Sequence, residues 1–162
     1  MKQLLFCVAT VLVASGAMAE SPTIFLIRHA ERADAGSSAQ ADPALSETGQ
    51  ARAAALAKEL RDAGISAIYT SEFKRTQQTA APIAKSLGVK AEVVPAKETT
   101  GLVAKLKSGS GNVLVVGHAN TLPEIIKGLG ISSPVAIAEK DYDDLFLVVL
   151  DRPPLLIHLH CR

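Results

Sequence analysis

Residues 23–32 read TIFLIRHAER, and this stretch decides the fold class. Its first half, residues 23–27, is a short apolar run, which predicts a strand buried on both faces. Strands of this kind are typical of a parallel sheet that is covered by helices. The second half places charged side chains and a histidine directly after the strand, where such sheets bind ligands.

Apolar runs like this one recur along the chain and alternate with helical patterns. Further strands are predicted at 65–69, 91–94, 113–116, 145–150 and 155–160. Helices are predicted from Ser46 to about residue 62, from Ser71 to about residue 87, from about residue 99 to 107, and from Thr121 to about residue 129. The alternation predicts an α/β fold in one domain, a three-layer α/β/α sandwich with a mostly parallel sheet. The last two strands, joined by the turn at 151–154, are expected to form a hairpin at the sheet edge.

Local signals indicate where the helices begin and end. Ser46 and Ser71 are predicted N-caps, and residues 121–124 (TLPE) have the form of a capping box. Glycine follows three of the helices and is expected to terminate them, at Gly64, Gly88 and Gly130.

The first nineteen residues have the pattern of a signal peptide. Lys2 precedes an apolar run at 4–14, and residues 17–19 (AMA) have the small-x-small form of a cleavage site. Eleven apolar residues are too few for a permanent membrane span, so no membrane anchor is expected. The sequence therefore predicts a signal peptide at 1–19, a domain at 20–162, and a periplasmic or secreted location.

The composition excludes several classes of function. Residues 20–162 carry 16 basic and 16 acidic side chains, and this balance argues against a nucleic-acid partner. Cys161 is the only cysteine outside the signal segment, so no intramolecular disulfide can form. Nothing in the composition indicates the oligomeric state.

Three segments place phosphate-binding side chains at one edge of the predicted sheet. Arg28 and His29 follow the first strand, His118 follows the fourth, and Arg75 lies in the first turn of the second helix. An arginine in that turn opposes the helix dipole unless an anion lies between them. Guanidinium groups match phosphate oxygens bidentately, so the convergence indicates phosphoryl chemistry. Nearby arginines disfavour imidazolium, which would keep His29 a neutral nucleophile that can form a phosphohistidine.

Four motifs in this order resemble the histidine phosphatase superfamily, the phosphoglycerate mutase-like group. They are LIRHAE (26–31), LSETGQ (45–50), YTS with RTQQTA (69–71 and 75–80) and VGH (116–118). The resemblance implies the phosphoglycerate mutase-like fold and a reaction that needs no metal and no cofactor. The usual Arg-His-Gly of the family is Arg-His-Ala here, and a negative φ at Ala30 would accommodate the change.

The resemblance also implies roles for individual residues. His29 would be the phosphorylated nucleophile, with Arg28, Arg75 and His118 completing the phosphate pocket. Glu98, past the end of the third strand, is the candidate general acid, and the alternative is that it only caps the next helix. Two further residues are candidates for substrate binding: Arg32 and Asn120.

The short chain favours a phosphatase over a mutase, because a mutase must exclude water and the polar stretch at 33–43 offers little material for a lid. The expected partner is a small phosphorylated substrate, such as a phosphosugar or a lipopolysaccharide-core phosphate. A mutase, a phosphohistidine (phosphoprotein) phosphatase and a non-catalytic phosphate-binding module remain alternatives.

Two features near the end of the chain have simpler interpretations. His158 and His160 share one face of the last strand, but with no third ligand nearby they are expected to lie on a solvated edge. The acidic residues Asp141, Asp143 and Asp144 lack EF-hand spacing and are expected to form a loop before a strand.

Overall fold

The computed structural model describes residues 21–33 and 42–161. The predicted signal peptide lies outside the described residues, as does 34–41 of the polar stretch. No helix in the described ranges is long and apolar enough to cross a membrane.

A six-stranded sheet forms the centre of the molecule, in the order β3-β2-β4-β1-β5-β6. The strands are β1 (Thr23–Arg28), β2 (Ile65–Thr70), β3 (Ala91–Val93), β4 (Asn112–Gly117), β5 (Asp144–Val149) and β6 (Leu155–His160). Strands β3, β2, β4 and β1 are parallel, β5 runs antiparallel to β1, and β6 runs antiparallel to β5. The mostly parallel sheet and the edge hairpin are both confirmed.

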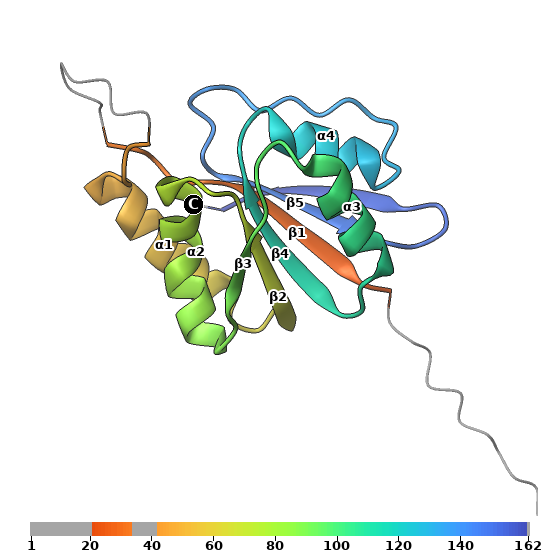
Figure 1. The fold of residues 1–162 in the computed structure, drawn as a ribbon, viewed down its shortest axis with the longest axis horizontal. Helices are drawn as coiled ribbons and strands as arrows, with labels where there is room; N and C mark the ends of the chain where they lie inside the picture. Colours follow the sequence, from red (N-terminus) through yellow and green to blue (C-terminus); the bar gives the residue numbers. More distant parts are fainter. Residues whose placement is uncertain (1–20, 34–41, 162) are drawn as a thin grey trace, which may run out of the picture.

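Helices cover both faces of the sheet, as Figure 1 shows. They are α1 (Glu47–Glu59), α2 (Lys74–Leu87), α3 (Thr99–Ser108) and α4 (Thr121–Gly128). Helices α1 and α2 pack on one face, and α3 and α4 pack on the other. The three-layer α/β/α sandwich is therefore confirmed.

Strand β1 is apolar at consecutive positions, rather than at every second one, because both of its faces are buried. Ile24 and Leu26 point into the core beneath α3 and α4, whereas Phe25 and Ile27 point into the core beneath α1 and α2. All four side chains are buried, each contributing about 1.5–3 kcal/mol to the free energy of unfolding. A strand with a core on both sides leaves polar chemistry only at its ends.

Two of the predicted N-caps are wrong, and so is one predicted helix end. The N-cap of α2 is Phe73 rather than Ser71, and that of α4 is Asn120 rather than Thr121; neither helix has a side-chain cap from its N-cap residue. Helix α1 ends at Glu59, several residues before Gly64. Ser46 is confirmed as the cap of α1, since its side chain accepts a hydrogen bond from the amide of Gly49.

The start of α1 packs very closely against the segment that follows β1. A Cβ added at Gly49 would lie 2.1 Å from the carbonyl oxygen of Glu31. The Glu31 carboxylate is held by Arg52 of α1 through bonds of 2.8–3.0 Å. The glycine and the ion pair together fix α1 against the residues that carry His29.

Candidate active site

Hydrogen bonding between β1 and β4 sets the positions of the two histidines. The strands pair in parallel with Arg28 opposite Gly117, and the amide of His29 donates to the Gly117 carbonyl at 2.9 Å. His29 and His118 thus leave neighbouring strands at the same point. Their ring centroids lie 5.4 Å apart, and both side chains are buried.

The hydrogen bond of His29 fixes its tautomer. Its Nδ1 lies 2.8 Å from the carbonyl oxygen of Ala30, which can only accept, so Nδ1 carries the proton. Nε2 is then left with a free lone pair. Burial, followed by the charges of Arg75, His118 and Arg28, lowers the pKa of His29 to about 4, although the Ala30 bond opposes this. At neutral pH the ring is an uncharged base and nucleophile.

Ala30 fits the position at which the family usually has glycine. Every described non-glycine residue has a negative φ, so the backbone here does not need glycine. The amide of Ala30 donates to Thr79 Oγ1 at 2.9 Å, and its side chain packs with Leu45 and Ala53. The substitution therefore leaves no strain beside the nucleophile.

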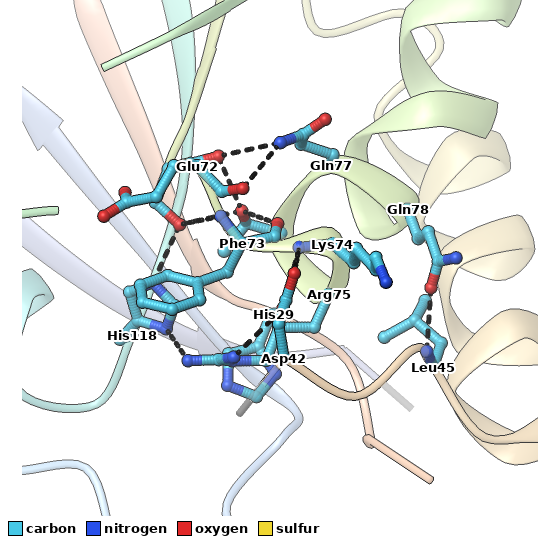
Figure 2. Close-up of polar contacts among 12 residues, drawn as sticks. His29, Asp42, Leu45, Glu72, Phe73, Lys74, Arg75, Gln77, Gln78 and His118 are labelled. Atoms are coloured by element: carbon cyan, nitrogen blue, oxygen red, sulfur yellow. Dashed lines mark hydrogen bonds and ion pairs between the residues drawn. The ribbon is translucent and has the colours of Figure 1, made fainter. Parts of the chain in front are cut away.

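His118 is held from both ends of its ring (Figure 2). Arg75 lies 3.4 Å from Nδ1 and must donate, so Nε2 carries the proton and donates to Ser71 Oγ at 2.9 Å. Thr121 Oγ1 accepts from the backbone amide of His118 at 3.1 Å. Burial, and then Arg75, lowers the pKa of His118 to about 4. The hydroxyls of Ser71 and Thr121, predicted to cap helices, instead hold this histidine.

Arg75 lies in the first turn of α2, as predicted, and the structure supplies the anion that such a position needs. The Asp42 carboxylate accepts from the amide of Lys74 at 3.0 and 3.1 Å, which caps α2. The same carboxylate lies 3.6 Å from an Arg75 Nη atom (Figure 2). A side chain of the protein thus occupies the place at which a phosphate oxygen would neutralise both the guanidinium and the helix end.

Arg28 is held by the segment before β5. Its guanidinium donates to the carbonyls of Ala138, Glu139 and Asp141 at 2.8–3.2 Å. It also stacks 4.2 Å from the ring centroid of Tyr142. Arg28 therefore contributes positive charge to the site while it orders this loop.

Each of the two pocket arginines lies on an aromatic ring, which sequence reasoning missed. Arg75 stacks 4.3 Å from the centroid of Phe73, as Arg28 does on Tyr142. The Nε atoms of both arginines are buried and find no hydrogen-bond partner in 21–33 and 42–161. Stacking restricts the guanidinium planes, and the two Nε donors stay buried without a partner in that part of the chain. No sequence signal marks either ring, because both contacts are long-range or cross a helix start.

The remaining predicted site residues lie further out. Arg32 is exposed, yet close enough to contribute to a lowered pKa of Arg75, whose main cause is burial. Asn120 is exposed at the start of α4. Glu98 is the exposed N-cap residue of α3 without a side-chain cap bond, and it lines a small pocket together with Ser71 and His118.

A second carboxylate, that of Glu72, lies at the same edge of the sheet, and the sequence pattern did not identify it as a site residue. It precedes Arg75 in the sequence, whereas the candidate general acid, Glu98, follows Arg75. Its Oε2 accepts from the amide of Ala96 at 2.8 Å, and its charge acts on both Arg75 and His118. Two glutamates thus border the site, one with its carboxylate bonded to the backbone and one without a cap bond.

Comparison with known proteins indicates a family and a shared fold. A family model of the histidine phosphatase superfamily (branch 1) matches residues 24–102. The chain is 39% identical over 75 residues to a Yersinia enterocolitica protein named "Probable phosphoglycerate mutase GpmB". That match covers 44% of this chain and only 35% of the relative.

Solved structures share the fold. The protein histidine phosphatase SixA, complexed with tungstate, has a TM-score of 0.68 at 22% identity, over 85% of this chain and 96% of that one. A mycobacterial glucosyl-3-phosphoglycerate phosphatase has a TM-score of 0.65 at 16% identity, over 86% of this chain and 99% of that one. At these identities the similarity extends to the fold alone.

Proposed function

The chain belongs to the histidine phosphatase superfamily, and we propose that it is a phosphomonoester hydrolase that works through a phosphohistidine at His29. One observation carries the proposal. The Nδ1–H of His29 is bonded to the Ala30 carbonyl, so the uncharged ring offers a lone pair at Nε2. The charges of Arg75, which is half-buried, and of Arg28, which is buried, both act on this ring. A nucleophile next to two cations fits in-line attack on a phosphate dianion.

The proposed reaction has two steps. Nε2 of His29 attacks phosphorus, the P–O bond to the leaving group breaks, and the leaving oxygen takes a proton from an acid. Water then attacks the phosphohistidine, breaking the P–N bond and returning inorganic phosphate. Arg75 and Arg28 offset the charge on the transferring group. A bound phosphate dianion favours imidazolium at His118, so that Nδ1 of this ring becomes a second hydrogen-bond donor beside Nε2, which already donates to Ser71.

We propose Glu98 as the acid that protonates the leaving oxygen. It faces the pocket beside His118 and has no side-chain cap bond to α3, whereas Glu72 is bonded to the Ala96 amide. Glu98→Gln should slow hydrolysis of an alkyl phosphate, which has a poor leaving group, by about 10²–10⁴-fold, and that of an activated aryl phosphate far less. Glu72→Gln is the matched control. Leaving-group dependence in the Glu72 variant alone would transfer the role to Glu72.

We propose a periplasmic phosphosugar or lipopolysaccharide-core phosphate as the substrate class, and this proposal rests on the signal pattern at 1–19, which predicts export of the protein. A library of phosphomonoesters assayed on the purified chain tests the class. Recovery of the protein from periplasmic fractions, beginning near residue 20, tests the location. Recovery only from the cytosol with an intact amino terminus would contradict it.

His29→Ala decides whether the site is catalytic at all. We expect the unsubstituted chain to turn over an aryl phosphate and to trap a phosphohistidine on acid-free quenching, and the variant to do neither. Transfer of the phosphoryl group to a sugar rather than to water would indicate a mutase. Equal inertness of both proteins, with phosphate binding retained, would indicate a binding module.

A further inference from the structure

The edge hairpin brings together two histidines and a carboxylate that the site does not use. Asp144 begins β5 and lies opposite His160 in the register with β6, and Phe146 lies opposite His158. One donor atom from each of Asp144, His158 and His160 falls within 4.8 Å of the other two. The expectation of no third ligand is therefore wrong, because the third ligand comes from the neighbouring strand.

The carboxylate of this cluster is buried, whereas its partners are open to solvent. The Asp144 side chain is 5% exposed, and the two imidazoles are 43% and 56% exposed. His158 Nε2 donates to Asp144 Oδ1 at 2.6 Å, and His160 Nδ1 lies 3.5 Å from the same oxygen. No lysine or arginine of the described ranges forms an ion pair with Asp144, so imidazoles are its only charge partners there. A buried carboxylate with an open approach on one side calls for a cation.

The ring of His158 is already restrained. It stacks on the core residue Phe146 with 4.3 Å between centroids and 22° between planes. Little side-chain entropy would be lost when a ligand engages Nε2, because stacking and the sheet register have fixed the ring. His160 lies 4.7 Å from His158, centroid to centroid, on the same face of β6.

We propose that Asp144, His158 and His160 bind a divalent transition-metal ion, with Zn²⁺ as the probe. Two imidazole nitrogens and one carboxylate oxygen are a ligand set that Zn²⁺ accepts at about 2.0–2.2 Å, with water in the remaining position. Mg²⁺ and Ca²⁺ prefer oxygen ligands alone and should bind poorly. The metal would replace the proton between His158 Nε2 and Asp144, and that proton moves to Nδ1 or to solvent.

The site is separate from the phosphate pocket but shares a segment with it. Asp144 follows Tyr142 by two residues, and the Arg28 guanidinium stacks on the Tyr142 ring. A metal ion that links β5 to β6 would restrain the carboxyl-terminal end of the segment before β5, which contains Tyr142. We therefore assign the ion a structural role outside the reaction.

Titration calorimetry of the untagged chain with Zn²⁺ tests the proposal. We expect one ion per chain, and His160→Gln should weaken binding at least tenfold, since even loss of an outer-shell partner costs about 10–100-fold. His160 is exposed on an edge strand, so this variant should fold; Asp144→Asn, which alters a buried group, is the second variant. Asp151→Asn, in the turn beyond β5, is the matched control and should bind Zn²⁺ unchanged. Binding that survives in both cluster variants would overturn the assignment.

The four histidines of the chain provide an internal control. In imidazole nitrogen NMR spectra, Zn²⁺ should shift the resonances of His158 and His160 and leave those of His29 and His118 in place. Mg²⁺ at the same concentration should shift none of them. Shifts confined to His29 and His118, or no shift in any ring, would refute the site.

Discussion

The neutral state of His29 has a direct consequence for the pH dependence of the reaction. Burial is the main cause of its low pKa, and the positive groups around it act in the same direction. With a pKa of about 4, about nine-tenths of the rings are uncharged at pH 5. A histidine with an ordinary pKa of about 6.5 would be about 3% uncharged at that pH. The structure therefore predicts roughly 30 times more active nucleophile at pH 5 than an exposed histidine would give.

The measurement is kcat/KM for an aryl phosphate between pH 3.5 and 7.5, corrected for the second ionisation of the substrate. This ratio reports groups of the free enzyme, so the acid limb should have its midpoint near 4. Histidine NMR of the free protein should give the same midpoint for His29, with His29→Ala assigning the resonance. Arg75→Gln should raise that midpoint only partly, because burial, the largest cause, remains. A midpoint near 6.5 in both measurements would refute the assignment of His29 as a preformed neutral nucleophile.

Three further outcomes follow. Folding lowers the pKa of His29 and His118 from 6.5 to about 4, so the unfolded chain binds protons at a higher pH than the folded chain does. The contribution of these histidines to the free energy of unfolding should therefore be complete above pH 6.5 and should decrease toward pH 4. Urea titrations should show this loss, and the loss should be smaller in a His118→Gln variant. Gly49→Ala should destabilise the fold by about 1–3 kcal/mol or more in the same assay, because the added Cβ would meet a backbone oxygen. Gly101→Ala in α3, where the added Cβ meets open space, is the control and should be neutral or stabilising by up to about 1 kcal/mol. Equal effects of the two substitutions would contradict the close packing at Gly49. Asp42→Asn should tighten vanadate or phosphate binding several-fold, as measured by calorimetry, because it removes the carboxylate that competes for the Arg75 guanidinium. The asparagine side chain can still cap α2. Unchanged affinity would show that this carboxylate does not compete with the ligand.

The order of strands and helices could be predicted from the sequence because it depends on local patterns. A run such as residues 23–27 has a core on both sides, and its apolar character is visible without any knowledge of its partners. The convergence at the sheet edge was predictable for the same reason, since carboxyl ends of parallel strands meet there. His29, His118 and Arg75 are accordingly found together.

The predicted cap at Ser71 failed because a distant partner competes with the local one, whereas the hydroxyl of Thr121 bonds to a residue only three positions earlier. Ser71 and Thr121 have the composition of N-caps, but their hydroxyls bond to His118, one to its ring and one to its backbone. The cap of α2 comes instead from Asp42, 32 residues away. A sequence window around the start of α2 contains neither Asp42 nor His118.

Cross-strand contacts were hidden in the same way. Asp144 was grouped with its acidic neighbours, although the register of β5 with β6 places it opposite His160. Only pairing of the two strands shows that the three residues form one cluster.

The parallel pairing of β1 with β4 also bears on how this architecture can diversify. His29 and His118 are spaced by main-chain hydrogen bonds at the centre of the sheet, which do not depend on the identity of neighbouring side chains. Strand β3 at the sheet edge and the segment 131–143 take no part in that pairing. Insertions and exchanges in these outer parts can therefore change which ligands the pocket admits without altering the spacing of the two histidines.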